Sequence, residues 1–259
     1  MANNQTPEEI LREILGGGAT ELDSSDIRSI EQYKLRGLTN LTKVNAPNCT
    51  SVGQYAFYGC SGLQEVSLPG VTSIGQYAFY GSGPAEMYFP GVTACTNSYI
   101  FQNTKARAIY FPNLTGKVGI GAFILSNGAS NGPQRICLPK VTGSNGGAAF
   151  RYNHFLEVFD YAGTSIGAYE FENCYVLSTL ILRKTGSITT IGSSNMFLKT
   201  PLSGYQGRTA TVYVPRDLIS SYENGTNWAS RFANGYVTFV ALEGSPYESE
   251  TWWENNPLV

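Results

Sequence analysis

Residues 52–60 read VGQYAFYGC and residues 74–82 read IGQYAFYGS, so nearly the same string returns after about 22 residues, the spacing of a repeated unit. Weaker copies of its first six positions begin at Val118 (VGIGAF), Ile166 (IGAYEF) and Ile191 (IGSSNM). The last positions of the copies form a series whose first four steps are equal and whose later steps vary: Leu35, Phe57, Phe79, Phe101, Phe123, Phe150, Phe171 and Met196. Such a series indicates an array of stacked units.

A second series lies between these copies and has the pattern apolar-x-apolar-Pro. It reads Val66-Ser-Leu68-Pro69, Met87-Tyr-Phe89-Pro90, Ile109-Tyr-Phe111-Pro112, Ile136-Cys-Leu138-Pro139 and Val212-Tyr-Val214-Pro215. The step from Val66 to Met87 is shorter by one position than the step from Met87 to Ile109. The alternation predicts a short strand that points two side chains inward and one outward. Proline ends the strand because it has no N–H to donate.

A period of about 22 residues lies in the range of leucine-rich repeats. We therefore expect an α/β, strand-rich repeat fold: a right-handed leucine-rich-repeat solenoid of about eight coils, because a single repeat cannot bury its apolar face alone. The predicted division is an N-terminal helical cap or docking segment over residues 1–27, the solenoid over 28–215, and a C-terminal cap with an aromatic tail over 216–259. Insertions rich in Gly, Ser and Asn fall at 126–147 and 198–210.

The string IGQYAFYGCSGLQEVSLPGVTSIGQYAFYGSG closely resembles the BspA-like leucine-rich repeats of bacterial surface proteins. The resemblance covers about residues 28–215 and is most specific over 52–112. It implies an extended, non-catalytic binding solenoid that is used for adhesion to proteins or cell surfaces.

Composition excludes several classes of function. The 259 residues carry 17 Lys and Arg against 19 Asp and Glu, a net charge of −2, which argues against electrostatic binding of nucleic acid. No apolar run is long enough to span a membrane. The start, Met1-Ala-Asn-Asn-Gln-Thr, lacks the basic and apolar regions of a secretory signal peptide.

Cysteine and histidine give little support for a metal site or a nucleophile. The five cysteines form no CxxC pair, and we expect buried thiols: Cys49, Cys60, Cys95, Cys137 and Cys174. The one histidine, His154, falls in a predicted turn, so no nucleophile and base stand out. We predict no catalytic residue, no cofactor, no metal and no enzymatic activity.

The outward positions of the predicted strands suggest a binding surface. The ligand-binding candidates are Tyr88, Tyr110, Phe159 and Tyr213, since tyrosine gives much contact area at low entropic cost. The alternative is that these rings stack across strands and only stabilise the sheet.

The two ends of the chain supply candidates for partner docking. Thr6-Pro7-Glu8-Glu9 predicts a helix start whose apolar face is Ile10, Leu11 and Ile14. That helix either shields the first coil or docks a partner. A short helix near Asp217 and a strand around 236–240 are expected next to the last coil. Trp252 and Trp253 either pack back onto this cap or insert into a partner.

Two functions remain open from the sequence. The first is a binding or adhesion module that recognises a protein or glycan on a cell surface, outside the cell if a signal peptide has been removed. The alternative is a structural or receptor-binding component of a bacteriophage virion or tail, made in the cytoplasm, released with the particle and contacting other virion subunits. The unpaired thiols and the absent signal sequence favour the second.

Overall fold

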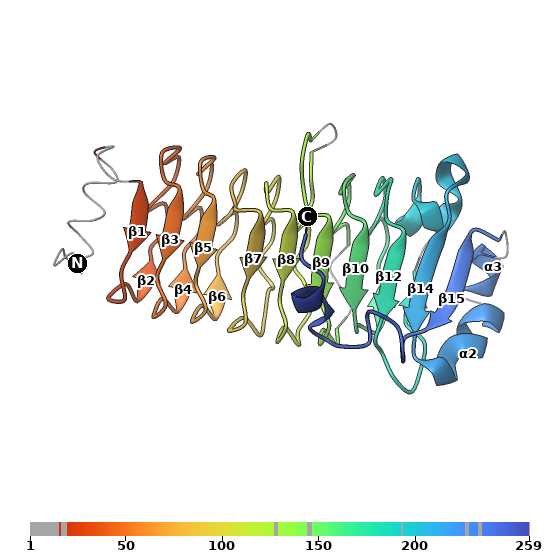
Figure 1. Ribbon diagram of the computed structural model, residues 1–259. Coiled ribbons are helices and arrows are strands. Elements are labelled where there is room, and N and C mark those ends of the chain that lie inside the picture. The colour runs from red at the N-terminus through yellow and green to blue at the C-terminus, as the bar shows by residue number, and fades with distance from the viewer. Residues whose placement is uncertain are drawn as a thin grey trace.

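The computed structural model describes residue 16 and residues 20–126, 129–143, 147–192, 194–225, 228–232 and 235–258. Short strands from successive repeats lie side by side in an elongated array (Figure 1). Strands predominate and helices are few, as expected of a leucine-rich-repeat fold.

The strands on one side of the array form two parallel sheets. The first sheet contains β1 (Glu21–Asp23), β3 (Lys43–Asn45) and β5 (Glu65–Ser67). The second has the order β15-β14-β12-β10-β9-β8-β7. Its strands are β7 (Glu86–Tyr88), β8 (Ala108–Tyr110), β9 (Arg135–Leu138), β10 (Val158–Tyr161), β12 (Thr179–Leu182), β14 (Ala210–Val214) and β15 (Val237–Ala241).

Shorter strands line the opposite side, where the chain returns between successive parallel strands. They are β2 (Ser29–Ile30), β4 (Ser51–Val52) and β6 (Ser73–Ile74) in one sheet, and β11 (Ser165–Ile166) and β13 (Thr190–Ile191) in another. Each ends on a buried Ile or Val that packs into the core between the two sides.

A row of stacked phenylalanines forms the centre of the core. The ring centroids are 5.0 Å apart for Phe57 and Phe79, 5.5 Å for Phe79 and Phe101, and 5.1 Å for Phe101 and Phe123. The row ends on Phe197, which stacks on Phe171 at 5.6 Å. In the last copy of the repeat, the position that the sequence assigned to Met196 is therefore occupied by the adjacent Phe197.

The repeats approach one another so closely that some positions accept only glycine. A Cβ on Gly53 would lie 2.5 Å from the backbone nitrogen of Gln32, and one on Gly75 would lie 2.4 Å from that of Gln54. The tyrosine two residues after each of these glycines has a positive φ, 57° at Tyr55 and 56° at Tyr77. This turn brings the chain back into the core at the following Phe.

Helical elements gather towards the C-terminal end of the array (Figure 1). They are η1 (Ser194–Phe197), η2 (Pro201–Ser203), η3 (Tyr205–Gly207), η4 (Arg216–Leu218), α2 (Ile219–Asn224) and α3 (Ala229–Phe232). The indole of Trp228 donates to the Thr189 carbonyl at 2.7 Å, and the Tyr222 hydroxyl accepts the Thr189 N–H at 2.7 Å. These bonds fix the helices against the last repeats.

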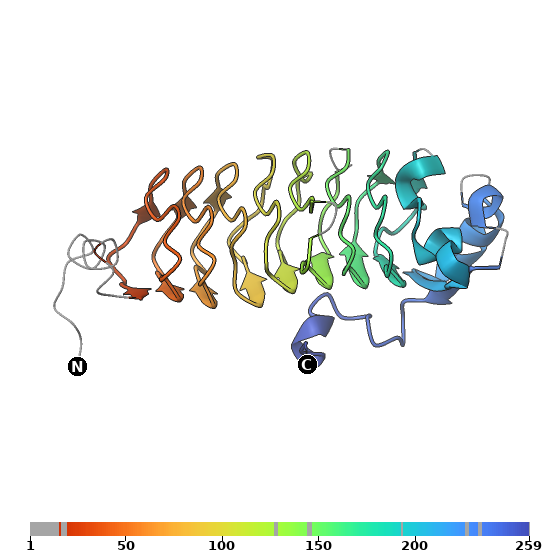
Figure 2. The ribbon, with the colours of Figure 1, turned by 90° about the horizontal axis from the view of Figure 1, so that it is seen from above.

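Residues 243–258, called the tail below, continue beyond β15 and end in η5 (Trp252–Asn255). Figures 1 and 2 show that the tail doubles back and crosses the outer face of the larger sheet. It therefore covers the strands of repeats that lie far away in the sequence.

Candidate functional site

The outward row of side chains on the larger sheet follows from the pairing register. Tyr88 pairs with Tyr110 and Tyr110 with Cys137. Cys137 then pairs with Asp160, and Asp160 with Ile181. Ile181 pairs with Tyr213, so this row is one continuous line across the face.

Phe159 does not belong to this row, and its predicted outward placement, on which its role as a binding candidate rested, is wrong. It pairs with Ile136 and Leu180, both inward, and it is fully buried against Phe150 at a centroid distance of 4.6 Å. In the stretch 156–161 both sets of alternate positions contain apolar residues: Leu156 and Val158 in one set, Phe159 and Tyr161 in the other. The two large rings of the second set fill the core. Asp160 takes the outward place instead.

The tail covers the middle of the outward row. Trp253 stacks on Tyr110 at a centroid distance of 5.0 Å, which leaves Tyr110 only 4% exposed. Burial raises the pKa of Tyr110 to about 12. Tyr213, which is half-buried, meets Tyr247 of the tail edge-on at 4.8 Å. Both tyrosines therefore contact their own chain.

Asp160 and Arg183 attach the tail to the sheet. The Arg183 guanidinium donates to both carboxylate oxygens of Asp160, at 2.7 and 2.9 Å. It also donates to the backbone carbonyls of three tail residues, Tyr247, Glu248 and Ser249. Burial raises the pKa of Asp160, although the bonds from Arg183 oppose this shift. Arg183 thus recognises main-chain atoms of the tail.

The paired tryptophans reinforce this attachment. The Trp252 indole N–H donates to Asp160 at 2.8 Å, and the Arg135 guanidinium lies 5.3 Å from its ring centroid. Arg135 also donates to the carbonyl of Asn256. Trp252 and Trp253 are 2% and 6% exposed. Of the two alternatives for these side chains, the structure shows packing on their own chain, on the face of the sheet rather than on the helical end.

The other docking candidates, Ile10, Leu11 and Ile14, lie outside the described residues. Of the four predicted binding residues, Tyr88 alone remains largely exposed, at 46%. It stands on β7 at the border between the covered and the open parts of the face. The open part extends from Tyr88 over the outward residues of β1, β3 and β5.

Another row of aromatic side chains lies away from this face. Tyr33, Tyr55, Tyr77 and Tyr99 stack in sequence with centroid distances of 5.0, 5.0 and 5.3 Å. Beside them the Gln32 amide donates to Gln54 at 3.2 Å. Since the ring faces contact one another, this row stabilises successive repeats and offers mainly ring edges to solvent.

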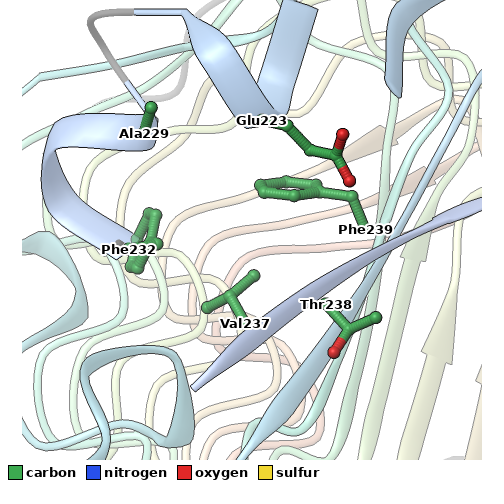
Figure 3. A pocket seen from close by; sticks show the side chains of 6 residues that line it. All are labelled: Glu223, Ala229, Phe232, Val237, Thr238 and Phe239. Carbon is green, nitrogen blue, oxygen red and sulfur yellow. The ribbon is translucent and has the colours of Figure 1, made fainter. Parts of the chain in front are cut away.

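The described residues bring together no catalytic set. His154 stacks on Tyr175 at 4.6 Å, and burial lowers its pKa. A hollow of about 280 Å³ at the C-terminal end is lined by polar and apolar groups, with Phe232 and Phe239 at its walls and Glu223 as its one carboxylate among the described lining residues (Figure 3). A single carboxylate without a partner group supports no acid–base mechanism.

Metal binding and membrane insertion also find no support in the described ranges. No group of three or more His, Cys, Asp and Glu side chains is placed there to hold a metal ion. No described helix has the length and apolar character needed to cross a bilayer. All five cysteines are buried, as predicted, and burial raises the pKa of Cys60 to about 11.

Sequence analysis missed two features of this surface. The Asp160–Arg183 pair joins adjacent strands to a tail 92 residues away from Asp160, and no motif marks it. The open half contains a break in the sheet between β5 and β7. The sequence carries no specific signal for that break, because the step from Val158 to Thr179 is as short as the step from Val66 to Met87 and its strands are paired.

Comparisons with solved structures find similar chains of low sequence identity. A leucine-rich repeat protein from Eubacterium ventriosum is 18% identical, covering 83% of this chain and 72% of that one with a TM-score of 0.37. A leucine rich cell surface protein from Faecalibacterium prausnitzii is 16% identical, covering 92% and 75% with a TM-score of 0.31. No curated protein matches the sequence.

The family comparison is stronger. The family described as BspA type leucine rich repeat region matches in six copies, over residues 20–130 and 143–206. These ranges contain most of the chain and all of the strands described above except β9, β14 and β15. The chain therefore belongs to the BspA-type leucine-rich-repeat family.

Proposed function

We propose that this chain is a non-enzymatic adhesion module that binds a protein or glycan on a cell surface through the open part of its sheet face. We take the stacked repeats to be the coils of a right-handed solenoid, about eight in number, with residues 1–27 and 216–259 as its end segments. Membership of a leucine-rich-repeat family indicates a protein-binding module.

The main support for this proposal is that the tail covers one part of the sheet face and leaves the other part open. The tail already contacts the apolar outward residues Tyr110 and Ile181, so a ligand cannot reach them while the tail is in place. The open part presents polar side chains with the exposed Tyr88 ring at its edge. A rigid surface of polar groups beside one aromatic ring suits recognition, because little entropy is lost on binding.

The experiment is a binding screen against cell-surface proteins and glycans with a matched pair of variants. Ser67 and Ser73 are exposed serines of the same repeat, in β5 and β6 on opposite sides of the array. We expect Ser67→Arg to abolish binding of any ligand found and Ser73→Arg to leave it unchanged. Equal binding by both variants would overturn the assignment of the face. Turnover of a glycan or peptide, lost on substitution of a named carboxylate, would overturn the non-enzymatic role.

A virion component is the second candidate. Five buried cysteines without a disulfide fit synthesis in a reducing compartment. Sedimentation of a native culture, with the chain followed by mass spectrometry, separates the two candidates. Migration with large particles beside other virion proteins supports the virion role, and recovery with the cell envelope contradicts it.

A further inference from the structure

The larger sheet ends on a strand that is paired on one side only. β15 is the last strand in the sheet order, and among the described strands it pairs with β14 alone (Figure 1). The Ala210 N–H donates to the Tyr236 carbonyl at 2.8 Å, and the Leu242 N–H donates to the Val214 carbonyl at 2.8 Å. Since a parallel ladder uses the backbone of alternate residues, the even-numbered residues of β15 bond to β14.

The odd-numbered residues of β15, Val237, Phe239 and Ala241, therefore point their N–H and C=O groups to the outer edge. In the described part of the chain, no other backbone bond reaches these groups. All three residues are partly exposed, whereas their partners on β14 are buried. The outer edge of the sheet is therefore open along the whole of β15.

The hollow of about 280 Å³ beside α3 lies along this edge. Val237 and Phe239 extend towards it from β15, and Phe232 lines it from α3 (Figure 3). Thr238 extends to the other face of the strand and still lines the hollow, so the hollow reaches the backbone edge. A strand added here gains backbone bonds and also contacts aromatic rings.

β15 carries none of the features that protect an edge strand from pairing. Protected edges contain charged side chains, proline or a bulge. β15 reads Val-Thr-Phe-Val-Ala and pairs with β14 residue for residue. The strand at the other end of the described array, β1, contains Glu21 and Asp23. Two copies of β1 repel each other, whereas two copies of β15 carry no charge to oppose their pairing.

β15 is also complementary to itself. When a second β15 runs antiparallel with the two Phe239 residues opposite each other, Val237 lies opposite Ala241 and Thr238 lies opposite Val240. The open groups at positions 237, 239 and 241 are symmetric about Phe239, so every N–H meets a C=O of the second strand. The opposed side chains are apolar or neutral, which favours pairing across the strands.

We propose that the outer edge of β15 is an interface for a second copy of this chain, which adds its own β15 as an antiparallel strand. The result is a two-fold symmetric dimer in which the two larger sheets form one continuous sheet. The pairing places the two Phe239 side chains next to each other on the inner face of the sheet. The inference does not depend on which ligand the open face binds, and a dimer presents that face twice.

The first test is sedimentation equilibrium of the full chain from about 1 to 500 μM, where we expect a dimer with a Kd below about 100 μM. Thr238→Lys places a charge on the edge strand and occurs twice in the dimer, so we expect dimerisation to weaken at least about tenfold. Thr179→Lys is the matched control. Thr179 lies in the same outward row, joined to Thr238 through Thr211, but two strands away from the edge. It should leave dimerisation unchanged.

A second pair of measurements tests the backbone itself. Ala241→Pro removes one open N–H and keeps the bonds to β14, since proline is tolerated where the N–H of an edge strand faces solvent. We expect it to weaken dimerisation at least about tenfold. Amide hydrogen exchange of the unmodified chain should slow at Phe239 as concentration rises, whereas Val240, bonded to β14, should be protected throughout. If Ala241→Pro does not fold, the exchange at Phe239 still decides the point.

Three outcomes overturn the inference: a monomer at every concentration, equal weakening by Thr238→Lys and Thr179→Lys, or a dimer in which the Phe239 N–H stays unprotected. A chain that stays monomeric, but gains protection at Phe239 when an unrelated strand-forming peptide is added, would assign the edge to another partner and also overturn it. The proposed function is tested separately, by Ser67→Arg and Ser73→Arg with the ligand found in the screen.

Discussion

Arg183 is the single residue on which the docking of the tail depends most. Its guanidinium is shared between a buried carboxylate and three backbone carbonyls of the tail, and its side chain is 7% exposed. Replacing Arg183 by Met keeps an unbranched chain but leaves Asp160 buried without its cation. Removing one partner of a buried pair costs about 3–5 kcal/mol. We expect Arg183→Met to lower the free energy of unfolding in urea by this amount at pH 8.

The loss of unfolding free energy in Arg183→Met should be larger at high pH than at low pH. Burial already raises the pKa of Asp160 above its ordinary value of 3.8, and Arg183 opposes the shift. Without Arg183 the pKa rises further, so the folded variant binds a proton between pH 3.8 and its raised pKa while the unfolded chain does not. Stability then falls as pH increases through this interval. Arg183→Met should therefore cost less at pH 4 than at pH 8, and equal costs would contradict the argument.

The exposed pair between Lys140 and Glu250, at 3.5 Å, provides the comparison. Exposed ion pairs contribute about 0–1 kcal/mol. Glu250→Gln removes a charge from the tail but leaves the buried bonds of Arg183 intact. Its unfolding free energy should stay within that range of the unmodified chain.

Tyr88 and Tyr110 are neighbours in one row but differ in what covers them. Tyr110→Ser removes the ring on which Trp253 stacks, and loss of a buried aromatic ring costs about 3–5 kcal/mol. Tyr88→Ser acts at an exposed ring and should change stability by no more than about 0.5 kcal/mol. Urea unfolding of the two single variants measures both values. Similar losses would show that the tail does not shield Tyr110 selectively.

At the scale of elements, the break between β5 and β7 should be visible in amide hydrogen exchange. The Ala85 N–H has no bond to the preceding repeat, whereas the Arg107 N–H is bonded at 2.7 Å. Open backbone groups exchange faster than bonded ones. We expect Ala85 and Glu86 to exchange at least about tenfold faster than Arg107 and Ala108, which occupy the same positions one repeat later. Equal protection at both steps would show that the ladder is continuous.

At the scale of the whole molecule, stability depends on contacts between neighbouring repeats. Gly75→Ala places a Cβ 2.4 Å from backbone, where no side chain can move aside. Gly37 has a φ of 75° and open space around it, so alanine there adds only conformational strain of about 1–2 kcal/mol. We expect Gly75→Ala to cost more than about 3 kcal/mol. Because strand pairing joins neighbouring repeats, the urea transition of this variant, followed by circular dichroism, should also split into two steps.

Much of this architecture could be predicted from local sequence. The apolar-x-apolar-Pro pattern predicted the positions of β5, β7, β8, β9 and β14, and the VGQYAFYGC string predicted the phenylalanines of the core. At 156–161 no proline follows the strand, and either set of alternate apolar residues could point inward. The prediction placed Val158 inward and Phe159 outward, which is wrong. Only the three-dimensional fit of Phe159 and Tyr161 in the core decides between them.

The candidate site was harder to predict because it depends on contacts between distant residues. An aromatic strip was expected at Tyr110 and Tyr213, but the tail that covers it lies beyond the last repeat. The contact between Trp252 and Asp160 joins residues 92 apart, outside the period that the sequence reveals. The break between β5 and β7 depends on backbone geometry, and the length of the step does not predict it, since β10 and β12 pair across an equally short one.

The distribution of aromatic residues divides the molecule into two optical reporters. Trp228 directly precedes α3, and Trp252 and Trp253 lie in the tail, so indole emission describes the C-terminal end and the part of the sheet that the tail covers. The stacked phenols of Tyr33, Tyr55, Tyr77 and Tyr99 belong to the N-terminal repeats and lie close enough for their transitions to couple. Unfolding of the two ends can thus be followed separately, in one cuvette and without any added label.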